Sequence, residues 1–523
     1  EPELHLRSVT LTAKDKICLC ETRECTPEAC PYANGYYARI KGALWDVLDV
    51  PCLTAETLQE YAERHTVCPF ELGLDSSLWS DVIIGDYNYL FDPVVHLVRF
   101  FESAGDYIFL VDEAHNLPGR AREMHSAALT KTSFYEAKKL LGKGKSSLKN
   151  ALTKVNDVFI EWRHRAEEET AARDGRFGKT FFLKERSEEF DHLLNRLCEP
   201  LEAWLDDHRE PDETHTALLQ LYFDVRAWLR VADTFDDHFV LQITASGSEV
   251  RAAQLCLDPS AFLADSFALG RAAVLFSATL APASYYKDLC GVPEARAVAL
   301  RSPFPAGNQG LFCIGNVSTR YKDRDASLAI VAESLATMVR ARCGNYLAFF
   351  PSYAYMEQAY AQFKEHCPEI NCIKQENAMD EQQKAAFLAQ FVPGPSQPLL
   401  GFAVMGGVFG EGVDLTGDRL IGVGIVGPGL PQVGPRQEQL RDYFEQTRGS
   451  GFDYAYRYPG MNKVLQAAGR VIRTPRDKGV VLLIDNRFAM PDYRRLMPPH
   501  WSHLKMIYDT EKLERELWRF WEE

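Results

Sequence analysis

Short apolar runs alternate with amphipathic helical stretches along much of this chain, and this alternation restricts the possible folds more than any other feature. Polar signatures follow several of the runs. Such alternation predicts parallel sheets covered by helices, an α/β fold. The chain has 523 residues, and at roughly 150 residues per domain it should form three or four domains. The predicted strands are Tyr107–Val111, Ala273–Phe276, Tyr346–Phe350, Leu399–Val404, Leu420–Val426 and Val480–Ile484.

The stretch from about Thr130 to Asp237 has a different character. It is rich in Lys, Glu, Arg, Leu and Ala, and it holds few strand-like runs. Its apolar residues show helical spacing, as in Leu193, Leu197 and Leu201. We therefore expect a mostly helical insertion, with a short β-rich piece after Phe239.

Composition indicates a globular protein, with 46% hydrophobic and 25% charged residues. The formal net charge of −15 argues against adhesion to nucleic acid by the whole surface, although it allows a basic groove. No apolar run approaches the ~18 residues of a membrane span. Residues Glu1 to Arg7 do not form a signal peptide. We expect an intracellular protein that does not bind membranes.

The first motif with chemical meaning is YIFLVDEAHN, from Tyr107 to Asn116. Carboxylates at the carboxyl end of a buried parallel strand lie where such sheets bind ligands. Asp112 could hold Mg²⁺, usually through water, while Glu113 could orient or deprotonate the water that attacks a γ-phosphate. The alternative is an acidic strand end without function.

A second motif, VLQAAGRVIR, runs from Val464 to Arg473 and precedes the strand VVLLID. Arg470 and Arg473 lie three apart, so on a helix both would project from one face. Two guanidinium groups in this arrangement suit a polyphosphate, and one could serve as an arginine finger. The alternative is a pair of solvated surface arginines.

Two further motifs lie between these. FSAT, from Phe276 to Thr279, follows an apolar strand, and GGVFGEGVDLTGD runs from Gly406 to Asp418. Its glycines permit close backbone approach to a phosphate, and its carboxylates are those of Glu411 and Asp414. Each motif is weak alone, whereas the order DEAH, SAT, FFPSY (Phe349–Tyr353), GxxFGEGVD and QAAGRVIR is specific.

That order resembles the motif order of the superfamily 2 helicases, and the residues within the motifs resemble those of the XPD/DinG branch. DYNYLFDP (Asp86–Pro93) and RSPFP (Arg301–Pro305) are typical of this branch, and the resemblance covers essentially the whole chain. It implies two RecA-like P-loop NTPase motor domains with an inserted iron–sulfur cluster domain and a helical arch domain. The implied boundaries are 1–17, 81–125 and 262–284 for the first motor domain, 18–80 for the cluster domain, 126–261 for the arch and 285–523 for the second motor domain.

The resemblance also implies roles for individual residues. ATP and Mg²⁺ would bind between the motor domains. The catalytic residues would be Asp112, Glu113 and His115 from the first domain and Gln466, Arg470 and Arg473 from the second. The cofactor-binding residues would be Gly412, Asp414, Gly469, Ser277 and Thr279. Of these, Gly412 and Asp414 would couple the nucleotide to the DNA, and Ser277 and Thr279 would link hydrolysis to domain closure.

Six of the thirteen cysteines lie before residue 70, and in a cytosolic chain such clustering favours metal over disulfides. Four thiolates could hold an iron–sulfur cluster or zinc. The resemblance favours a 4Fe-4S cluster, and the expected ligands are Cys18, Cys25, Cys30 and Cys68. Cys20 could replace Cys18 as the first ligand, and Cys52 could be a small buried apolar residue.

Aromatic and basic residues follow the third of these cysteines. Tyr32, Tyr36, Tyr37, Arg39 and Lys41 suit the stacking of bases and contact with phosphates. A solvated helix packed by tyrosines explains them equally well.

No segment of the 523 residues matches the phosphate-binding loop G-x-x-x-x-G-K-S/T. The string Gly144-Lys145-Ser146 is a decoy, because Lys139 stands where the first glycine belongs. In the XPD/DinG branch this loop precedes the cysteine cluster. We expect truncation, with the loop upstream of Glu1, and no hydrolysis by the chain without it.

The sequence therefore favours an ATP-dependent DNA helicase that translocates on single-stranded DNA, 5′ to 3′ as the resemblance implies, in DNA repair or replication. Its partners would be single-stranded and forked or displaced-strand DNA. We expect a monomer in the bacterial cytoplasm, associated with the nucleoid. The alternative is a noncatalytic iron–sulfur nucleic-acid-binding module that has lost the phosphate loop.

Overall fold

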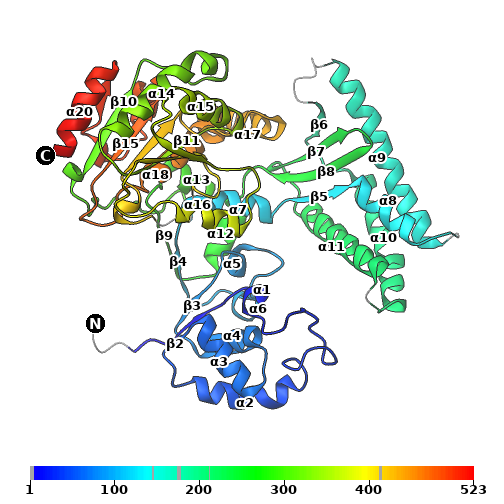
Figure 1. Ribbon diagram of the computed structural model, residues 1–523. Helices are drawn as coiled ribbons and strands as arrows, with labels where there is room; N and C mark the ends of the chain where they lie inside the picture. The colour runs from blue at the N-terminus through cyan, green and yellow to red at the C-terminus, as the bar shows by residue number, and fades with distance from the viewer. Residues whose placement is uncertain (1–4, 144–145, 173–177, 211, 411–414, 523) are drawn as a thin grey trace. The chain divides into compact units, whose positions relative to one another are not determined.

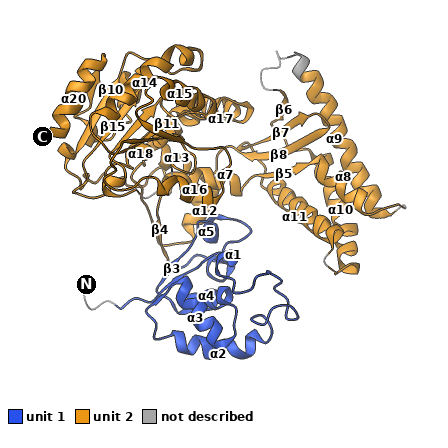
Figure 2. Cartoon of the chain, in the orientation of Figure 1, with its two compact units in different colours: residues 1–105 blue, residues 106–523 orange. Residues whose placement is uncertain are grey.

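The computed structural model describes the chain except residues 1–4, 144–145, 173–177, 211, 411–414 and 523. Two glycine-rich sequence features therefore fall partly outside the described residues: the string that begins at Gly144, and Gly412 with Asp414. The chain divides into two compact units, residues 1–105 and 106–523 (Figure 2). Of the helices in the described part of the chain, none has the length and apolar character that a membrane crossing requires.

The first unit is a small α/β body. Its parallel sheet has the order β2-β1-β3, with strands Cys52–Leu53, Ser8–Thr10 and Val82–Ile84. The core beside this sheet includes Val9, Ile40 and Leu58. Its helices are α1 (Lys14–Ile17), α2 (Tyr36–Val47), α3 (Ala55–His65), α4 (Pro69–Ser76), α5 (Asn88–Phe91) and α6 (Val98–Phe101).

The second unit opens with the strand that carries DEAH. Strand β4 (Ile108–Val111) pairs in parallel with β9 (Ala272–Leu275), and Val111 lies opposite Leu275. This register brings the residues after both strands to the same edge. Helices α7 (Leu117–Met124) and α12 (Ser260–Ala268) flank the long insertion between the two strands.

The insertion combines helices with a sheet (Figure 1). Its antiparallel sheet has the order β5-β8-β7-β6, with strands Ala127–Thr130, Glu249–Cys256, Phe239–Ser246 and Lys179–Leu183. Aromatic residues from helices and sheet, among them Phe159, Phe181 and Trp228, fill its core. The helices are α8 (Lys131–Leu140), α9 (Ser147–Ala172), α10 (Glu188–Asp207) and α11 (Glu213–Asp233).

The second half of this unit is built on a seven-stranded parallel sheet of order β12-β13-β11-β14-β15-β10-β16. Alternate residues of one strand enter different cores: Leu347 and Phe349 of β11 lie in one, Tyr346 and Phe350 in the other. A strand buried on both faces reads as a continuous apolar run, which is why four strands of this sheet, β11, β13, β14 and β15, were predicted, whereas β10, β12 and β16 were not. The strands are Asn371–Lys374, Leu399–Val404, Asn345–Phe350, Gly422–Val426, Gly479–Ile484, Gln309–Ile314 and Lys505–Ile507 in sheet order.

Helices cover both faces of this sheet. On one face lie α14 (Arg324–Arg340), α15 (Tyr353–His366) and α20 (Thr510–Glu522), and on the other α16 (Glu381–Ala389), α18 (Tyr458–Ala468) and α19 (Pro491–Arg494). The buried residues of α13 (Ala283–Leu289) and α17 (Pro435–Arg448) belong to a different apolar cluster. A π-helical turn, Asp453–Arg457, precedes α18.

A separate apolar cluster attaches the insertion to the second half. Leu255 of β8 belongs to the same buried cluster as Leu440 and Phe444 of α17 and Tyr454 of the π-helical turn. Arg448 of α17 also lies 3.7 Å from the buried carboxylate of Asp258, just beyond β8. We call this set the insertion-base cluster.

Candidate functional site

The DEAH segment lies at the carboxyl end of β4. The carboxylate of Asp112 accepts a hydrogen bond from the backbone N–H of Glu113 at 2.7 Å. Glu113 has φ 44°, in the left-handed region that costs a non-glycine residue energy. The N–H of Ala114 donates to the carbonyl of Phe276, beyond β9, at 3.1 Å. The backbone thus holds the Glu113 side chain, which is mostly exposed, at this edge.

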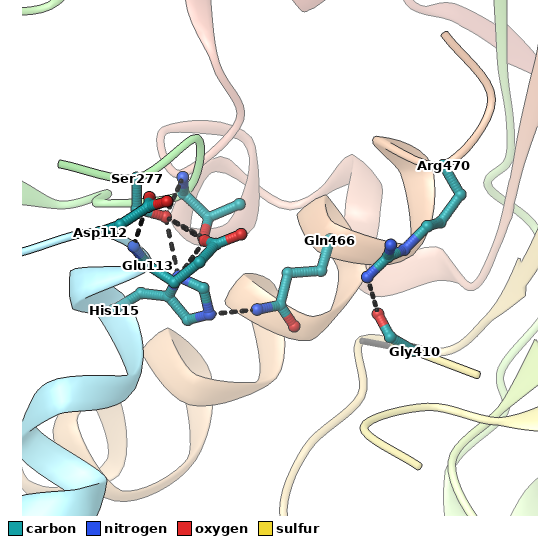
Figure 3. Close-up of polar contacts among 8 residues, drawn as sticks. Asp112, Glu113, His115, Ser277, Gly410, Gln466 and Arg470 are labelled. Atoms are coloured by element: carbon teal, nitrogen blue, oxygen red, sulfur yellow. Dashed lines mark hydrogen bonds and ion pairs between the residues drawn. The ribbon is translucent and has the colours of Figure 1, made fainter. Parts of the chain in front are cut away.

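Nearly buried His115 connects the DEAH segment with the SAT segment (Figure 3). Its Nδ1 lies 2.8 Å from the hydroxyl of Ser277 and 3.2 Å from a carboxylate oxygen of Glu113. The Ser277 hydroxyl donates to Glu113 at 3.2 Å and accepts from the N–H of Thr279 at 3.2 Å. This pattern assigns the ring proton of His115 to Nδ1, which leaves Nε2 as an acceptor.

Gln466 of α18 is the hydrogen-bond partner of Nε2 of His115. Its side-chain amide nitrogen hydrogen-bonds Nε2 of His115, across 351 positions of sequence (Figure 3). DEAH, SAT and QAAGR are therefore joined in one hydrogen-bonded chain, Ser277–His115–Gln466.

The structure contradicts the prediction that Arg470 and Arg473 extend from one face of a helix. Helix α18 ends at Ala468, with Gly469 as its C-cap. Pro475 disfavours helix at Thr474, and the carboxylate of Asp477 accepts from the N–H groups of Arg473 and Thr474 at 2.8 and 2.7 Å.

These interactions place the segment after α18 in an irregular loop. Burial alone would raise the pKa of Asp477, but hydrogen bonds from Thr474 and from the two N–H groups lower it below its ordinary value. The Arg470 guanidinium donates to the carbonyl of Gly410 at 2.7 Å, which ties this loop to the glycine-rich segment (Figure 3).

A residue that the sequence analysis missed supports the start of the glycine-rich segment. Gln375 follows β12 and is 2% exposed. Its amide donates to the Tyr353 hydroxyl at 2.7 Å and accepts from the N–H of Val404 at 3.0 Å. It therefore joins the FFPSY loop to the segment that contains Gly410. A polar residue at a strand end was the only sequence signal.

A Gly-Lys-Thr string, Gly178 to Thr180, escaped the sequence analysis. Lys179 and Thr180 begin β6 and pair with β7. The Lys179 ammonium forms an ion pair with Glu167 at 2.7 Å. A lysine held in an antiparallel strand pair and ion-paired with a carboxylate does not form a phosphate loop.

In the first unit, cysteines gather around one pocket of about 220 Å³. Sγ of Cys20 lies 3.8 Å from Sγ of Cys30, and burial, with the neighbouring Cys30 and Cys18 thiols, raises the pKa of Cys20 to about 11. Within the described residues no three potential ligands surround one point closely enough to hold a single ion. The cysteines that line the pocket are Cys18, Cys20, Cys25, Cys30 and Cys68.

Cys52 does not line this pocket. It lies in β2 and is exposed, so the prediction that it is a small buried residue is wrong. Strand β2 is only two residues long, and Cys52 points to the solvent face while Leu53 enters the core.

The aromatic and basic residues near the pocket divide into two groups. Tyr36 is buried and donates to the carboxylate of Asp75 at 2.8 Å; burial, reinforced by Asp75, raises its pKa. The Arg39 guanidinium donates to the carbonyls of Thr66 and Pro31 at 2.9 and 3.0 Å. Both residues stabilise the fold. On α2, solvent faces Tyr37 (89% exposed), Lys41 and Trp45 (76% exposed).

Comparisons with known proteins agree with this arrangement of motifs. A family model described as DEAD_2 matches residues 4–134, and one described as helicase C-terminal domain matches residues 335–504. Among solved structures, one titled XPD_Helicase has a TM-score of 0.60 at 18% identity, covering 97% of this chain and 87% of the other. The structure of S. tokodaii Xpd4 has a TM-score of 0.56 at 15% identity, covering 83% of each chain. The fold is thus that of XPD helicase structures.

Curated proteins similar to this chain include named helicases and helicase subunits. The general transcription and DNA repair factor IIH helicase subunit XPD of Schizosaccharomyces pombe is 24% identical over 85% of this chain. The ATP-dependent DNA helicase CHL1 of Coccidioides immitis is 22% identical over 86%, and the regulator of telomere elongation helicase 1 of Rattus norvegicus is 22% identical over 95%. The chain spans 67%, 60% and 45% of these three proteins.

Proposed function

We propose that the chain is the motor part of an enzyme that uses ATP hydrolysis to move along single-stranded DNA and unwind duplexes, because it resembles the XPD-like superfamily 2 helicases in two family-model matches and in curated relatives at 22–24% identity. The observation that carries this proposal is the Ser277–His115–Gln466 hydrogen-bonded chain. A protein that only binds DNA has no need to connect a candidate water-activating carboxylate to a distant helix. The 5′ to 3′ direction and a role in DNA repair or replication are proposed on the resemblance to this family alone.

The residues at the carboxyl end of β4 fit the chemistry of phosphoryl transfer. Mg²⁺, when bound, would neutralise charge that develops on the phosphates. Asp112 offers the oxygen ligand that Mg²⁺ prefers, directly or through water. Glu113 would orient the attacking water, and the Ser277 hydroxyl, which donates to Glu113 at 3.2 Å, would fix that carboxylate.

The second half would contribute charge and coupling. Arg470 and Arg473 would contribute guanidinium groups to the phosphates, and Arg470 donates to the carbonyl of Gly410. Gln466 would couple a change in the position of His115 to α18 through the hydrogen bond between the two side chains. Gly412 and Asp414 are proposed to couple the nucleotide to DNA on their sequence motif alone.

The phosphate loop is proposed to come from outside these 523 residues, since none of them provides the G-x-x-x-x-G-K-S/T pattern. One structural feature supports this. Ile108, Leu110 and Val274, on the paired strands β4 and β9, are 63%, 69% and 50% exposed. Apolar side chains so exposed beside a candidate catalytic carboxylate form a surface suited to the strand and helix that flank a phosphate loop.

A test of the motor function compares ATP hydrolysis with and without single-stranded DNA, using the protein expressed from its complete reading frame. We expect DNA to stimulate hydrolysis, and Glu113→Gln to reduce it by about 10² to 10⁴-fold while DNA binding is unchanged. Hydrolysis that Glu113→Gln leaves intact would contradict the proposed role of Glu113.

The noncatalytic alternative, an iron–sulfur nucleic-acid-binding module, is favoured by the missing phosphate loop alone. It predicts DNA binding without hydrolysis in the same experiment. The two proposals are therefore separated by one measurement.

We also propose that the cysteine pocket holds a 4Fe-4S cluster. A zinc ion needs four thiolates at about 2.3 Å from one point, whereas the described cysteines surround a cavity without converging on a point. The cluster would supply a rigid cross-link between the segment that precedes α2 and the Cys68 start of α4.

Iron and acid-labile sulfide in anaerobically purified protein test this proposal. Cys30→Ser and Cys68→Ser should remove most of the iron, while Cys52→Ser, outside the pocket, should keep it. The first ligand is identified by whichever of Cys18→Ser and Cys20→Ser loses iron. Zinc at one equivalent in place of iron would refute the cluster.

A further inference from the structure

Arg324 carries a charge that the described residues do not neutralise. It opens α14 and is partly buried, yet it forms no ion pair with any described carboxylate. Its Nε is buried without a hydrogen-bond partner, and one terminal nitrogen donates to the Ser352 hydroxyl at 3.3 Å. Burial lowers the pKa of Arg324, and Arg487 acts in the same direction, but a guanidinium remains charged.

The neighbouring Arg487 shows the opposite arrangement. Its Nε and Nη2 donate to the buried carboxylate of Asp485 at 2.7 and 2.8 Å. The charge of Arg487 is therefore neutralised by Asp485, whereas the charge of Arg324 is not neutralised by a described carboxylate. An uncompensated, partly buried cation is costly, so it is a site for an external anion.

Aromatic rings flank the uncompensated cation. The Arg324 guanidinium lies 5.0 Å from the ring centroid of Tyr355, which is fully buried, and 5.4 Å from that of Tyr321. Tyr321 is 87% exposed. A large aromatic side chain exposed to this extent beside a cation offers a stacking surface for a base whose phosphate the cation binds.

Arg324 and Ser352 both lie near one edge of the seven-stranded parallel sheet, from which an external anion can approach them. Ser352 follows β11, Arg324 begins the helix after β10, and β11 and β10 end at the same edge of the parallel sheet. This is the edge where parallel sheets bind ligands.

We propose that Arg324, Ser352 and Tyr321 form a binding site for one nucleotide of single-stranded DNA, with the guanidinium and hydroxyl on the phosphodiester and the tyrosine ring on the base. The proposal rests on the proposed function and names a substrate contact within it. Thr319, whose hydroxyl and N–H bind Asp485, and Asp323, which accepts from Ser318 at 2.6 Å, are engaged elsewhere.

The salt dependence of DNA binding tests the phosphate contact. Affinity of the wild-type chain for a labelled oligothymidine is measured by fluorescence anisotropy over a series of salt concentrations. Loss of one phosphate contact should reduce the slope of log K against log salt by about 0.7. We expect this change in Arg324→Gln.

Arg340→Gln is the matched control. Arg340 ends the same helix and pairs with Glu369 at 2.6 Å, so the variant removes an equal charge outside the site. An unchanged slope in Arg324→Gln, or an equal reduction in both variants, would overturn the inference. Failure of the wild-type chain to bind the oligonucleotide would instead reject the proposed function.

Two further variants protect the test against misfolding. Tyr321→Ala changes an exposed residue and should weaken binding about fivefold or more without altering the slope. Arg324→Lys keeps the charge but loses the planar fork, so the slope should persist while affinity falls about fivefold. Wild-type affinity in both variants would refute the site.

Competition distinguishes a phosphodiester from free phosphate. At constant ionic strength, inorganic phosphate should displace the oligonucleotide from wild-type protein no better than chloride. Specific displacement by phosphate that disappears in Arg324→Gln would assign the site to a free anion and overturn the DNA assignment.

Discussion

Replacement of Asp485 by asparagine should destabilise the second half of the chain more than any surface charge change. The Asp485 carboxylate is fully buried at the end of β15. It accepts hydrogen bonds from the N–H and hydroxyl of Thr319 at 3.0 and 2.5 Å, and from the N–H, Nε and Nη2 of Arg487 at 2.7, 2.7 and 2.8 Å. The carboxylate thus binds two segments that flank the sheet edge.

The magnitude follows from what asparagine cannot do. Its amide nitrogen replaces an oxygen that accepts, which leaves a buried donor unpaired, and its neutral side chain leaves Arg487 without a counter-charge. Breaking a buried ion pair costs about 3–5 kcal/mol. We expect Asp485→Asn to lower the local free energy of opening of β10 and β15 by that amount.

Native-state hydrogen exchange of the amides in β10 and β15 measures this free energy. Asp492→Asn is the control, because Asp492 is half-exposed and pairs with Arg457 and Arg495 at 3.4 and 3.6 Å. Surface pairs contribute about 0–1 kcal/mol. Equal effects of the two substitutions would refute the reasoning.

The pH dependence provides a second check. Burial alone would raise the pKa of Asp485, but hydrogen bonds and the charge of Arg487 lower it below its ordinary value. A carboxyl group with a lowered pKa stabilises the fold above its unfolded-state pKa of about 3.9, and this contribution is lost as pH falls through the folded-state value. The difference between wild type and Asp485→Asn should be constant near neutrality and narrow in acid; a gap that widens in acid would contradict the assignment.

Three other substitutions test separate parts of the site and fold. Gln466→Ala should lower DNA-stimulated ATP hydrolysis by the complete protein about tenfold, the value of one hydrogen bond, while oligonucleotide affinity stays the same; loss of affinity would instead indicate a DNA contact. Glu113→Gly should abolish hydrolysis yet stabilise the fold by about 1 kcal/mol, since it relieves a left-handed φ, which thermal unfolding would detect. Gly291→Ala should lower the unfolding temperature far more than Gly247→Ala, because both have positive φ but only at Gly291 would a new Cβ lie 2.1 Å from the carbonyl oxygen of Ser260.

The sequence predicted β11, β13, β14 and β15 because burial on both faces leaves a continuous apolar signature, but it missed β10, which is also buried. Leu399–Val404 forms a strand with the expected bounds, and Ala273–Phe276 is displaced by one residue, to Ala272–Leu275. The insertion was expected to be mostly helical, and its four helices agree. Its strand β6 was not predicted, since Lys179–Leu183 pairs with a strand about 60 residues away.

The motifs identified residues but not their geometry. His115 and Gln466 meet across 351 positions, which no local pattern encodes. The prediction that Arg473 lies on a helix was wrong because the Asp477 carboxylate accepts hydrogen bonds from the N–H groups of Arg473 and Thr474. In a longer helix these N–H groups would donate to backbone carbonyls. Arg324 stood out only when the structure showed that its guanidinium forms no ion pair with a described carboxylate and that its Nε is buried without a partner, which are properties of the folded chain.

The insertion-base cluster has a consequence for the modularity of the chain. The insertion interrupts the first half of the second unit, yet its sheet is buried against Leu440, Phe444 and Tyr454 of the second half. Deleting residues 126–261 would expose these apolar side chains to water. The shortened chain would then carry an exposed apolar patch that favours aggregation. The insertion is thus covalently attached between β4 and β9, but the apolar contacts that stabilise it come from α17 and the π-helical turn. Sequence changes on either side of this contact therefore affect the stability of the other side.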